Sequence, residues 1–544
     1  MANARQLTGV FATAARNRRL LRVGIAFAAF NGAEVGVWVS LLVYGYNHGG
    51  ATTASLIALV QVVPSIVLAP WSGSWADRRR PGRVLLAGYL AQGAAMAVVA
   101  AVMAAGGGIV LVFVVAPLIN LAISVTRPAQ AALLPSVVAS PEELAAANAG
   151  QNWLESAGTI CAPIAAGVLL ALGGPQLAVA GMAVLVTCAA ALVLNINGPP
   201  PFAGEEQPHG SVAQTLAGVR AIMADRPTRT LVGILGAQYV LLGALDLLYV
   251  VLAIDVLDMG DAGAGYLTAA FGFGGLLAIA ITATLVGRSR LAPALFAGGL
   301  IASGALLVIA ISPSQVVAFA LIGVAGVGRA VFDVTGRTLL QRTASPAALA
   351  AAFGLLESLL NAGLAGGALI VPLLVAVGGP TAALAGTGAL MCAALFAVLP
   401  RLRSVDASAI VPLVELNLLR GIRLFTALPA PALESLARGL ERLRVVAGDV
   451  VIRQGDHGDR YYAIARGELD VAIDGAHVRT CTPPEGVGEL ALLHDTPRTA
   501  TVTARTDADL YALEREPFLQ ALTGHVSHRY AEWAPAEPPA PALT

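Results

Sequence analysis

Residues 291–312 read LAPALFAGGLIASGALLVIAIS and contain no charged side chain. A helix of about 20 mostly apolar residues crosses the hydrocarbon core of a bilayer, so this run predicts a membrane span. Further runs of the same kind bring the total to twelve. The twelve runs are 22–46, 53–76, 83–105, 109–130, 143–172, 175–195, 229–254, 264–286, 291–312, 314–340, 346–377 and 380–400.

The charged residues divide the chain into two parts. Residues 1–400 hold 18 Arg and 14 acidic residues, whereas the much shorter segment 401–544 holds 15 Arg and 19 acidic residues. A soluble protein carries about 25% charged residues, which only the second part approaches. The composition therefore predicts a membrane part followed by a soluble part, and it excludes a purely soluble enzyme. The net charge of zero gives no indication of a nucleic-acid partner.

The arginines near the apolar runs predict the orientation. They cluster before the first run and then at every second connection, and the intervening connections contain none. Because loops rich in arginine stay in the cytoplasm, both termini are expected there, in a multi-pass protein of the cytoplasmic (inner) membrane. The arginines used are Arg16, Arg18, Arg19, Arg22, Arg78, Arg79, Arg80, Arg83, Arg127, Arg220, Arg226, Arg229, Arg288, Arg290, Arg337, Arg342, Arg401 and Arg403.

An internal repeat divides the apolar runs into two sets of six. The sequence Gly-Gly-Pro at 173–175 recurs at 378–380, and Leu-Glu-Ser at 154–156 recurs at 356–358. The sequence thus predicts a membrane all-α fold of twelve transmembrane helices in two six-helix bundles. The halves are residues 1–195 and 229–400, and a central cytoplasmic loop, 196–228, contains an amphipathic stretch at 211–223.

The connection between the second and third runs carries a distinctive motif. Residues 73–83 read GSWADRRRPGR. This is similar to the Gly-x-x-x-Asp-Arg-x-Gly-Arg-Arg loop of the major facilitator superfamily, with two extra residues before the second glycine. The resemblance implies that Gly73, Asp77, Arg78 and Arg83 gate the conformational change. The alternative is that the arginines only anchor the loop in the cytoplasm.

Two further stretches, 127–135 (RPAQAALLP) and 141–149 (PEELAAANA), resemble the exporter branch of that superfamily. The resemblance implies a secondary active transporter for a small molecule, with the substrate site between the halves. Because the runs are mostly Ala, Gly, Leu and Val, we expect an amphipathic cargo. Its identity, the direction of transport and the coupling ion stay open.

Charged residues inside apolar runs are costly and are commonly functional. Glu34 lies in the first run and Asp246 in the seventh, and these helices are cavity-lining counterparts in the family's fold. The resemblance therefore implies that Glu34 and Asp246 couple transport to protons, with Arg127 and Asp333 as further cavity residues. The alternative for the carboxylates is a structural hydrogen bond, and the alternative for Arg127 is a cap at the cytoplasmic end of its helix. Arg329 lies four residues before Asp333, a spacing that predicts an ion pair on one helix face.

Four polar residues of the first and seventh runs are additional candidates to line the cavity. They are Asn31, Trp38, Gln238 and Tyr239.

The soluble part changes pattern after a predicted linker, 401–415. Short alternating segments around 445–452, 461–465 and 469–473 predict strands, and Asp474-Gly475 predicts a two-residue hairpin turn. Helical segments flank them. The sequence predicts a soluble β-roll domain with flanking helices at 416–530, followed by a proline-rich tail at 531–544.

Residues 488–501 (GELALLHDTPRTAT) resemble the phosphate-binding cassette of cyclic nucleotide-binding domains. A cyclic phosphate carries one negative charge and needs a guanidinium and backbone N–H donors. Arg498 would supply the guanidinium, Glu489 would accept the ribose 2′-hydroxyl, and Gly488 would allow close approach. The backbone amides of Leu490, Ala491 and Thr499 would donate. We expect cAMP as the ligand, and the Thr499 side chain leaves cGMP open.

The working hypothesis is a transporter regulated allosterically by a cyclic nucleotide, with the lipid bilayer and an unknown small molecule as its other partners. Two alternatives remain. One is a membrane sensor that no longer transports, and the other is a lipid or drug exporter whose tail is independent of nucleotide. No nucleophile–base set and no metal-ligand spacing is found, so the sequence predicts neither an enzyme nor a metal cofactor.

Overall fold

The computed structural model describes most of the chain. The described residues are 17–77, 79–137, 141–196, 219–220, 222–285, 288, 290–344, 346–408, 413–426, 428, 430–494 and 496–523. They belong to two compact units. One contains residues 22–130 and 153–411, and the other contains 1–21, 131–152 and 412–544.

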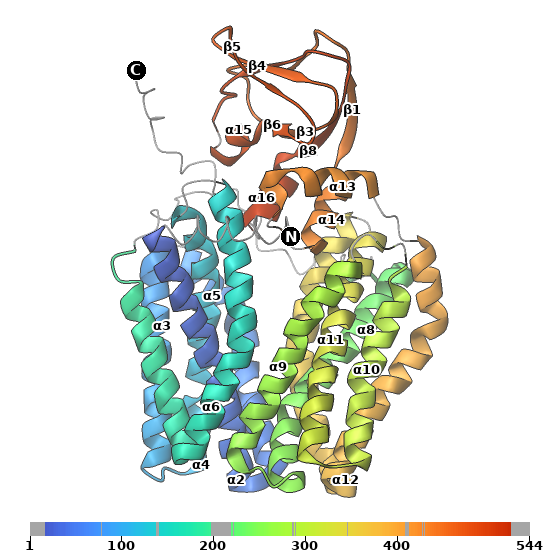
Figure 1. The fold of residues 1–544 in the computed structure, drawn as a ribbon. Helices are drawn as coiled ribbons and strands as arrows, with labels where there is room; N and C mark the ends of the chain where they lie inside the picture. Colours follow the sequence, from blue (N-terminus) through green and yellow to red (C-terminus); the bar gives the residue numbers. More distant parts are fainter. Residues whose placement is uncertain are drawn as a thin grey trace. The chain divides into compact units, whose positions relative to one another are not determined.

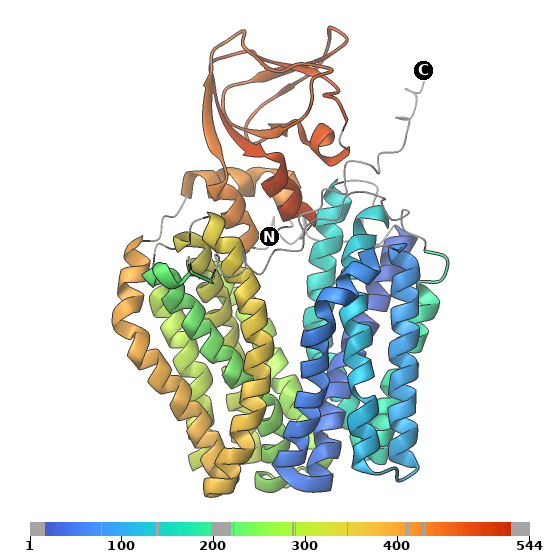
Figure 2. The same cartoon turned by 180° about the vertical axis from the view of Figure 1, so that it is seen from behind.

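Within the described residues, nine helices are long and apolar enough to cross a membrane. Figures 1 and 2 show long helices running alongside one another in this part of the chain. The helical segments are α2 (Arg18–Asp77), α3 (Pro81–Ala104), α4 (Ile109–Val115), α5 (Pro117–Val137), α6 (Pro141–Leu192), α8 (Arg226–Val251), the π-helical turn η1 (Leu252–Val256), α9 (Gly260–Leu285), α10 (Ala292–Ile311), α11 (Gln315–Thr343) and α12 (Pro346–Ser408).

Three of these helices are interrupted by glycines at the predicted turns. Helices α2, α6 and α12 contain 60, 52 and 63 residues, and each has non-helical backbone near its middle. The left-handed residues there are Gly50 (φ 65°), Gly174 (φ 71°) and Gly379 (φ 80°). Only glycine adopts this conformation without a steric cost, which explains why the Gly-Gly sequences end one helical stretch and begin the next.

Side-chain caps fix the starts of several helices. Asp225 accepts a hydrogen bond from the Thr228 backbone N–H (3.1 Å) at the start of α8. Asp406, near the end of α12, accepts from the backbone N–H groups of Leu291 (2.9 Å) and Ala292 (3.1 Å) at the start of α10. A carboxylate is favourable at the positive end of a helix dipole. The predicted linker 401–415 therefore contains a helical part, up to Ser408, that is bonded to α10.

Among the described residues, hydrogen bonds join the predicted halves, 1–195 and 229–400, within the membrane unit. The indole N–H of Trp38 donates to Asp246 (3.0 Å), and the Ser55 hydroxyl donates to the backbone oxygen of Ala368 (2.6 Å). Tyr46 donates to Asp255, and Asn47 donates to Asp261 (2.9 Å). The last two pairs lie beside connections that contain no arginine.

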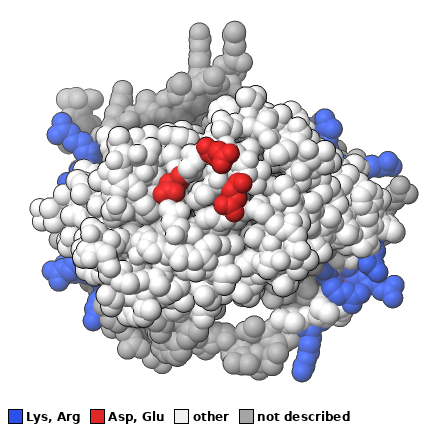
Figure 3. All heavy atoms as spheres, turned by 90° about the horizontal axis from the view of Figure 1, so that it is seen from below, with Lys and Arg blue, Asp and Glu red and all other residues white. Residues whose placement is uncertain are grey.

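The same end of the unit has few charges. Figure 3 shows acidic side chains gathered near the centre of an otherwise uncharged face. The acidic residues of the connections at this end are Asp255, Asp258 and Asp261. Two of them take part in the bonds between the halves, so this small acidic group helps to hold the halves together.

The soluble part is a β-roll of two antiparallel four-stranded sheets. The sheet orders are β1-β8-β3-β6 and β2-β7-β4-β5. The strands are β1 (Glu441–Val445), β2 (Val450–Ile452), β3 (Arg460–Arg466), β4 (Leu469–Ile473), β5 (Ala476–Cys481), β6 (Gly486–Val487), β7 (Thr501–Ala504) and β8 (Ala508–Glu514). The helices are α13 (Leu413–Gly421), η2 (Arg423–Phe425), α14 (Ala430–Arg438), α15 (Glu489–His494) and α16 (Arg515–Thr523).

The predicted hairpin turn is confirmed. Asp474 (φ 51°) and Gly475 (φ 81°) both have positive φ between β4 and β5, as a type I′ turn requires. The space between the sheets is filled by small and branched apolar side chains, among them Ile464, Leu469 and Leu510.

An aromatic cluster holds the flanking helices. The Tyr461 ring of β3 stacks on Phe518 of α16 with centroids 5.1 Å apart, and both contact Phe425 of η2 edge-on. Burial of three aromatic side chains is a large contribution to such a small domain. The cluster fixes the helices that precede and follow the roll.

Candidate functional site

The cassette of the β-roll is built around a buried arginine. Arg498 is 5% exposed. Its Nη1 donates to the backbone oxygen of Gly488 (2.9 Å) and its Nη2 donates to that of Arg460 (2.6 Å). The nearest carboxylate oxygen, of Asp459, is 3.6 Å away on a side chain that is 71% exposed. Both hydrogen-bond partners of the guanidinium are therefore neutral, and the ion pair with the exposed Asp459 side chain is weak.

Burial has an electrostatic consequence for this arginine. Desolvation lowers the pKa of Arg498, and the nearby Tyr462, Asp459, Glu489 and Asp456 oppose that shift. A guanidinium stays protonated at any physiological pH in spite of such a shift. The site therefore holds a permanent cation in partly dry surroundings, which favours binding of an anion.

Two glycines make room for the guanidinium. Gly488 has φ 96°, and a Cβ there would lie 2.6 Å from Arg498 Nη1. A Cβ on Gly458 would lie 2.6 Å from the Ala491 Cβ and 3.4 Å from Arg498 Cζ. The two 2.6 Å distances are shorter than ordinary contacts, so both positions require glycine in this arrangement.

The structure brings several predicted residues together around Arg498. Glu489 opens helix α15 directly after Gly488, is half-buried, and acts electrostatically on Arg498. Leu490 is 46% exposed and Ala491 is 3% exposed in the same turn. The first N–H groups of a helix have no partner within it, which leaves donors beside the arginine. Thr499 is exposed next to Arg498 in the chain.

The 455–459 loop is a part of the site whose contacts the sequence did not reveal. The Gly455 N–H donates to the Arg498 backbone oxygen (2.8 Å), and the Arg498 N–H donates to the Asp456 backbone oxygen (2.8 Å). These bonds position the backbone of Arg498, and the Arg460 carbonyl orients its side chain. Hydrogen bonds between main-chain groups do not depend on residue type, so they cannot be predicted from the sequence. Only the glycines of this loop mark it in the sequence.

The membrane unit holds a second set of charged residues. Arg127 Nη2 of α5 lies 2.6 Å from Glu34 Oε2 of α2 and 3.3 Å from Asn31 Oδ1. The guanidinium also lies over the ring of Phe30, 5.8 Å from its centroid. The side chains of Arg127 and Glu34 are 45% and 28% exposed. Two predicted cavity residues thus form one ion pair, which explains how both charges are tolerated within the helices.

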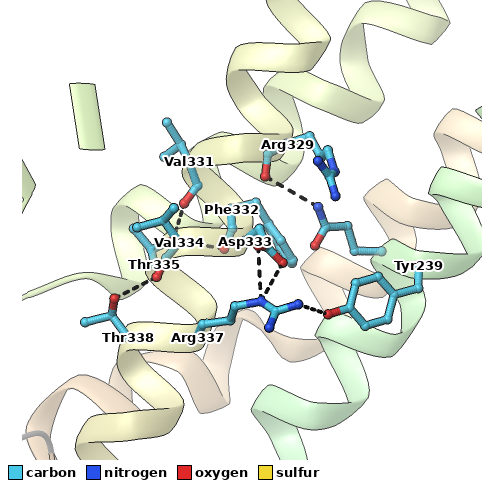
Figure 4. Close-up of polar contacts among 10 residues, drawn as sticks. Tyr239, Arg329, Val331, Phe332, Asp333, Val334, Thr335, Arg337 and Thr338 are labelled. Atoms are coloured by element: carbon cyan, nitrogen blue, oxygen red, sulfur yellow. Dashed lines mark hydrogen bonds and ion pairs between the residues drawn. The ribbon is translucent and has the colours of Figure 1, made fainter. Parts of the chain in front are cut away.

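The corresponding region of the second half corrects one prediction. Asp333 pairs with Arg337, whose Nε lies 3.1 Å from both carboxylate oxygens, and the predicted pair with Arg329 is wrong. Arg337 Nη2 also donates to the Tyr239 hydroxyl of α8 (2.7 Å). Figure 4 shows Arg337 between Asp333 and Tyr239. This additional bond to α8 favours the partner one turn after Asp333 over the partner one turn before it.

Asp246 lies where the two halves meet. It accepts the hydrogen bond from Trp38 of α2, and it interacts electrostatically with Arg329 of α11. Glu34 and Trp38 are four residues apart on α2 and therefore share a face of that helix. All four additional cavity candidates, Asn31, Trp38, Gln238 and Tyr239, take part in hydrogen bonds within these two charged regions.

Most of the predicted gating residues lie outside the described part of the structure. Arg78 and the side chains of Gly73 and Asp77 lie outside the described residues. Arg83, in the first turn of α3, is exposed. Most of the 211–223 stretch and all of the 531–544 tail also lie outside the described residues. Among the residues that are described, no group of three or more His, Cys, Asp or Glu is arranged to hold a metal ion.

Comparison with known proteins identifies both parts of the chain. Residues 22–324 match the Major Facilitator Superfamily, and residues 442–525 match the cyclic nucleotide-binding domain. The protein is thus a multi-pass membrane protein of a transporter class with a nucleotide-binding domain at its C-terminal end. Because the first match covers more than half of its 544 residues, the chain belongs to the Major Facilitator Superfamily.

The second part is similar to a protein kinase regulatory subunit. The cAMP-dependent protein kinase type II regulatory subunit of Drosophila melanogaster is 37% identical over 103 residues, which are 19% of this chain and 27% of the relative. The chain thus spans about a quarter of that relative's length.

Solved structures are also similar to this part. One is the regulatory domain of Toxoplasma gondii PKA with cAMP, at 32% identity, 21% coverage of this chain, 46% of that chain and a TM-score of 0.20. Another is the regulatory subunit of a cAMP-independent protein kinase A from Trypanosoma brucei, at 29% identity, 21% and 42% coverage and a TM-score of 0.20.

Proposed function

We propose that the protein is a secondary active transporter whose transport cycle is set by cAMP bound to its C-terminal domain. The observation that carries this proposal is the combination, in one chain, of a superfamily transporter with an intact arginine cassette. The buried Arg498, whose hydrogen bonds go to neutral backbone oxygens, is suited to a cyclic phosphate. Similarity to a relative named as a cAMP-dependent regulatory subunit supports cAMP as the ligand.

The membrane part would have twelve spans in two six-helix halves. A continuous helix of 52 residues would be about 78 Å long, which is more than twice the hydrocarbon core of a bilayer. The glycine interruptions in α2, α6 and α12 support two spans for each of these helices. The arginine-bearing connections then all fall on one side, which favours cytoplasmic termini in the cytoplasmic membrane.

The arrangement of hydrogen bonds supports alternating access. Tyr46–Asp255 and Asn47–Asp261 join the halves beside connections that lack arginine, which by this orientation face away from the cytoplasm. The described conformation would then be closed on the outer side. Rocking of the halves would break these bonds and open the outer side.

Glu34 and Asp246 would couple this motion to protons. Protonation of Glu34 would remove the negative charge that pairs with Arg127. Protonation of Asp246 would weaken the bond from Trp38, because a neutral carboxyl is a weaker acceptor than a carboxylate. The Asp246 event would change a contact between the halves, and the Glu34 event would change an ion pair between α2 and α5 inside the first half. A coupling group must change contacts that differ between the two states of the cycle. The cargo would be a small amphipathic molecule moved outward.

In the β-roll, Arg498 would bind the cyclic phosphate and Glu489 the ribose 2′-hydroxyl. The bound nucleotide would shift the transport equilibrium only by its differential affinity for the two states, typically about 1–3 kcal/mol. Thr499 is the residue to examine for a preference between cAMP and cGMP.

The test uses the full-length protein in proteoliposomes. Transport of a panel of amphipathic fluorescent dyes is followed under an imposed pH gradient, with and without cAMP. We expect at least one dye to move and its rate to change with cAMP. Absence of transport for every dye would favour a sensor, and a rate indifferent to cAMP would favour a nucleotide-independent tail.

A further inference from the structure

Arg329 differs from Arg127 and Arg337, two arginines that form ion pairs within the membrane-spanning helices. Arg127 has the Glu34 carboxylate at 2.6 Å and Arg337 has the Asp333 carboxylate at 3.1 Å. In the part of the chain that the structure describes, Arg329 has no carboxylate within ion-pair distance, and its buried Nε has no hydrogen-bond partner. A charge inside a membrane protein is expensive, so an unpaired guanidinium there needs an explanation.

Unsatisfied polar atoms accumulate around this arginine. Gln238 donates its amide to the Arg329 backbone oxygen (3.4 Å), yet its Oε1 has no partner. The Tyr249 hydroxyl also has no hydrogen-bond partner among the described residues. It interacts electrostatically with both Arg329 and Asp246. Gln238 and Tyr249 are each only 3% exposed. Because buried polar groups are almost always hydrogen-bonded, these neighbouring donors and acceptors are suited to bind a polar ligand.

The group faces the meeting of the two halves. Asp246 interacts electrostatically with Arg329, and it accepts a hydrogen bond from Trp38 of the opposite half. Figure 4 shows Arg329 on α11 above Asp333 and Arg337, with Tyr239 of α8 nearby. The charges of Asp333 and Arg337 already satisfy each other, whereas Arg329 has no carboxylate within ion-pair distance among the described residues.

The chemistry of these atoms selects an oxyanion. The guanidinium is a permanent cation with a planar set of N–H donors that matches a carboxylate or a phosphate. The Tyr249 hydroxyl is a second donor. The neighbouring carboxylate of Asp246 accepts the Trp38 N–H and lies beyond ion-pair distance of Arg329.

We propose that Arg329 receives the anionic carboxylate or phosphate group of the transported molecule, with Tyr249 as a second donor. This inference rests on the proposed transport function and specifies its substrate class. The cargo is then an amphipathic acid whose apolar part contacts the Ala-, Gly- and Leu-rich helices.

The experiment measures equilibrium binding to the full-length protein in nanodiscs. The probes are naphthoate, naphthyl phosphate and the matched cation naphthylmethylammonium. We expect the wild type to bind at least one of the two anions and not the cation. Arg329→Gln should weaken anion binding by about tenfold to a hundredfold, because charge-assisted hydrogen bonds are lost, and Arg329→Lys should bind with intermediate affinity. Arg290→Gln, which removes an exposed arginine outside the helices, should bind as the wild type does.

Three results would overturn the inference: no binding of either anion, equal anion binding by Arg329→Gln, or cation binding as tight as anion binding. Retained cAMP binding and a single size-exclusion peak identify the variants that are folded, and Arg329→Lys provides the test if Arg329→Gln is not. Because binding requires no flux, Arg329-dependent binding without transport would contradict only the transport proposal. Transport without Arg329-dependent binding would contradict only this inference.

Discussion

Arg498 of the β-roll and Arg127 of helix α5 both lie in functional positions, but their partners differ. Arg498 is held by the neutral backbone oxygens of Gly488 and Arg460, whereas Arg127 is held by the Glu34 carboxylate at 2.6 Å. The first arrangement fixes the geometry of the guanidinium and keeps its charge available. The second neutralises the charge of the guanidinium in an ion pair between two side chains. The two arginines thus differ in whether neutral carbonyl oxygens or a carboxylate hold the guanidinium.

Glu34→Gln gives the largest expected effect on this comparison. The substitution removes the negative partner of Arg127 permanently and resembles the protonated state. Proton-driven dye transport should fall to the level of protein-free liposomes, as measured by fluorescence under an imposed pH gradient. Asp258→Asn changes an exposed acid with positive φ, a conformation that Asn tolerates, and serves as the control. Unaltered pH dependence in Glu34→Gln would remove Glu34 from the coupling role.

Arg498→Ala tests the other side of the comparison. Loss of two or more charge-assisted hydrogen bonds to the phosphate should weaken cAMP binding by about a hundredfold or more, as measured by calorimetry. Arg444→Ala removes an arginine that is 77% exposed in the same domain and should leave the affinity unchanged. Equal affinities for wild type and Arg498→Ala would refute the assignment of the cassette.

Gly488→Ala separates the position of the guanidinium from its charge. The new Cβ would lie 2.6 Å from Arg498 Nη1 at a φ of 96°. We expect the β-roll to lose about 1–2 kcal/mol of stability from the left-handed backbone alone, together with weaker cAMP binding. Thermal unfolding and calorimetry measure the two effects. Gly439→Ala, whose Cβ would be at an ordinary 3.4 Å from Leu513, is the matched control. Unchanged affinity in a folded Gly488→Ala protein would speak against a precise role for Arg498.

Tyr239→Phe should have the smallest effect. It removes the hydroxyl that accepts from Arg337 at 2.7 Å, a bond worth about 0.5–1.5 kcal/mol, and leaves the Asp333–Arg337 pair in place. A slightly lower unfolding temperature with retained transport is expected, since the Asp333 charge is still neutralised. Complete loss of transport at an unchanged unfolding temperature would instead place Tyr239 in contact with the cargo.

Local sequence patterns predicted a large part of both the fold and the nucleotide site. The Gly-Gly turns were visible because only glycine adopts the required φ at Gly50 and Gly174. The cassette was visible because Gly488, Glu489 and Arg498 are close in the sequence and each has a distinct chemical task. In both cases one short segment contains the whole physical requirement.

Contacts between distant segments could not be predicted in this way. Asp333 has an arginine four residues before it and another four residues after it, and helix geometry allows either pair. Tyr239, almost a hundred residues away, accepts a hydrogen bond from Arg337, and no residue near Asp333 in the sequence predicts this contact. The capping of α10 by Asp406 could not be predicted for the same reason, because the Asp406 carboxylate and the Leu291 N–H are 115 residues apart.

The bond from Asp406 to the start of α10 also determines how tightly the C-terminal domain is tethered. Helix α13 begins at Leu413, seven residues after this attachment, and seven residues span at most about 25 Å. A tether this short keeps the nucleotide-binding domain at an effective local concentration in the millimolar range. Under the proposed regulation, an attraction far weaker than two separate proteins would need would then be sufficient for the domain to favour one state of the transporter over the other.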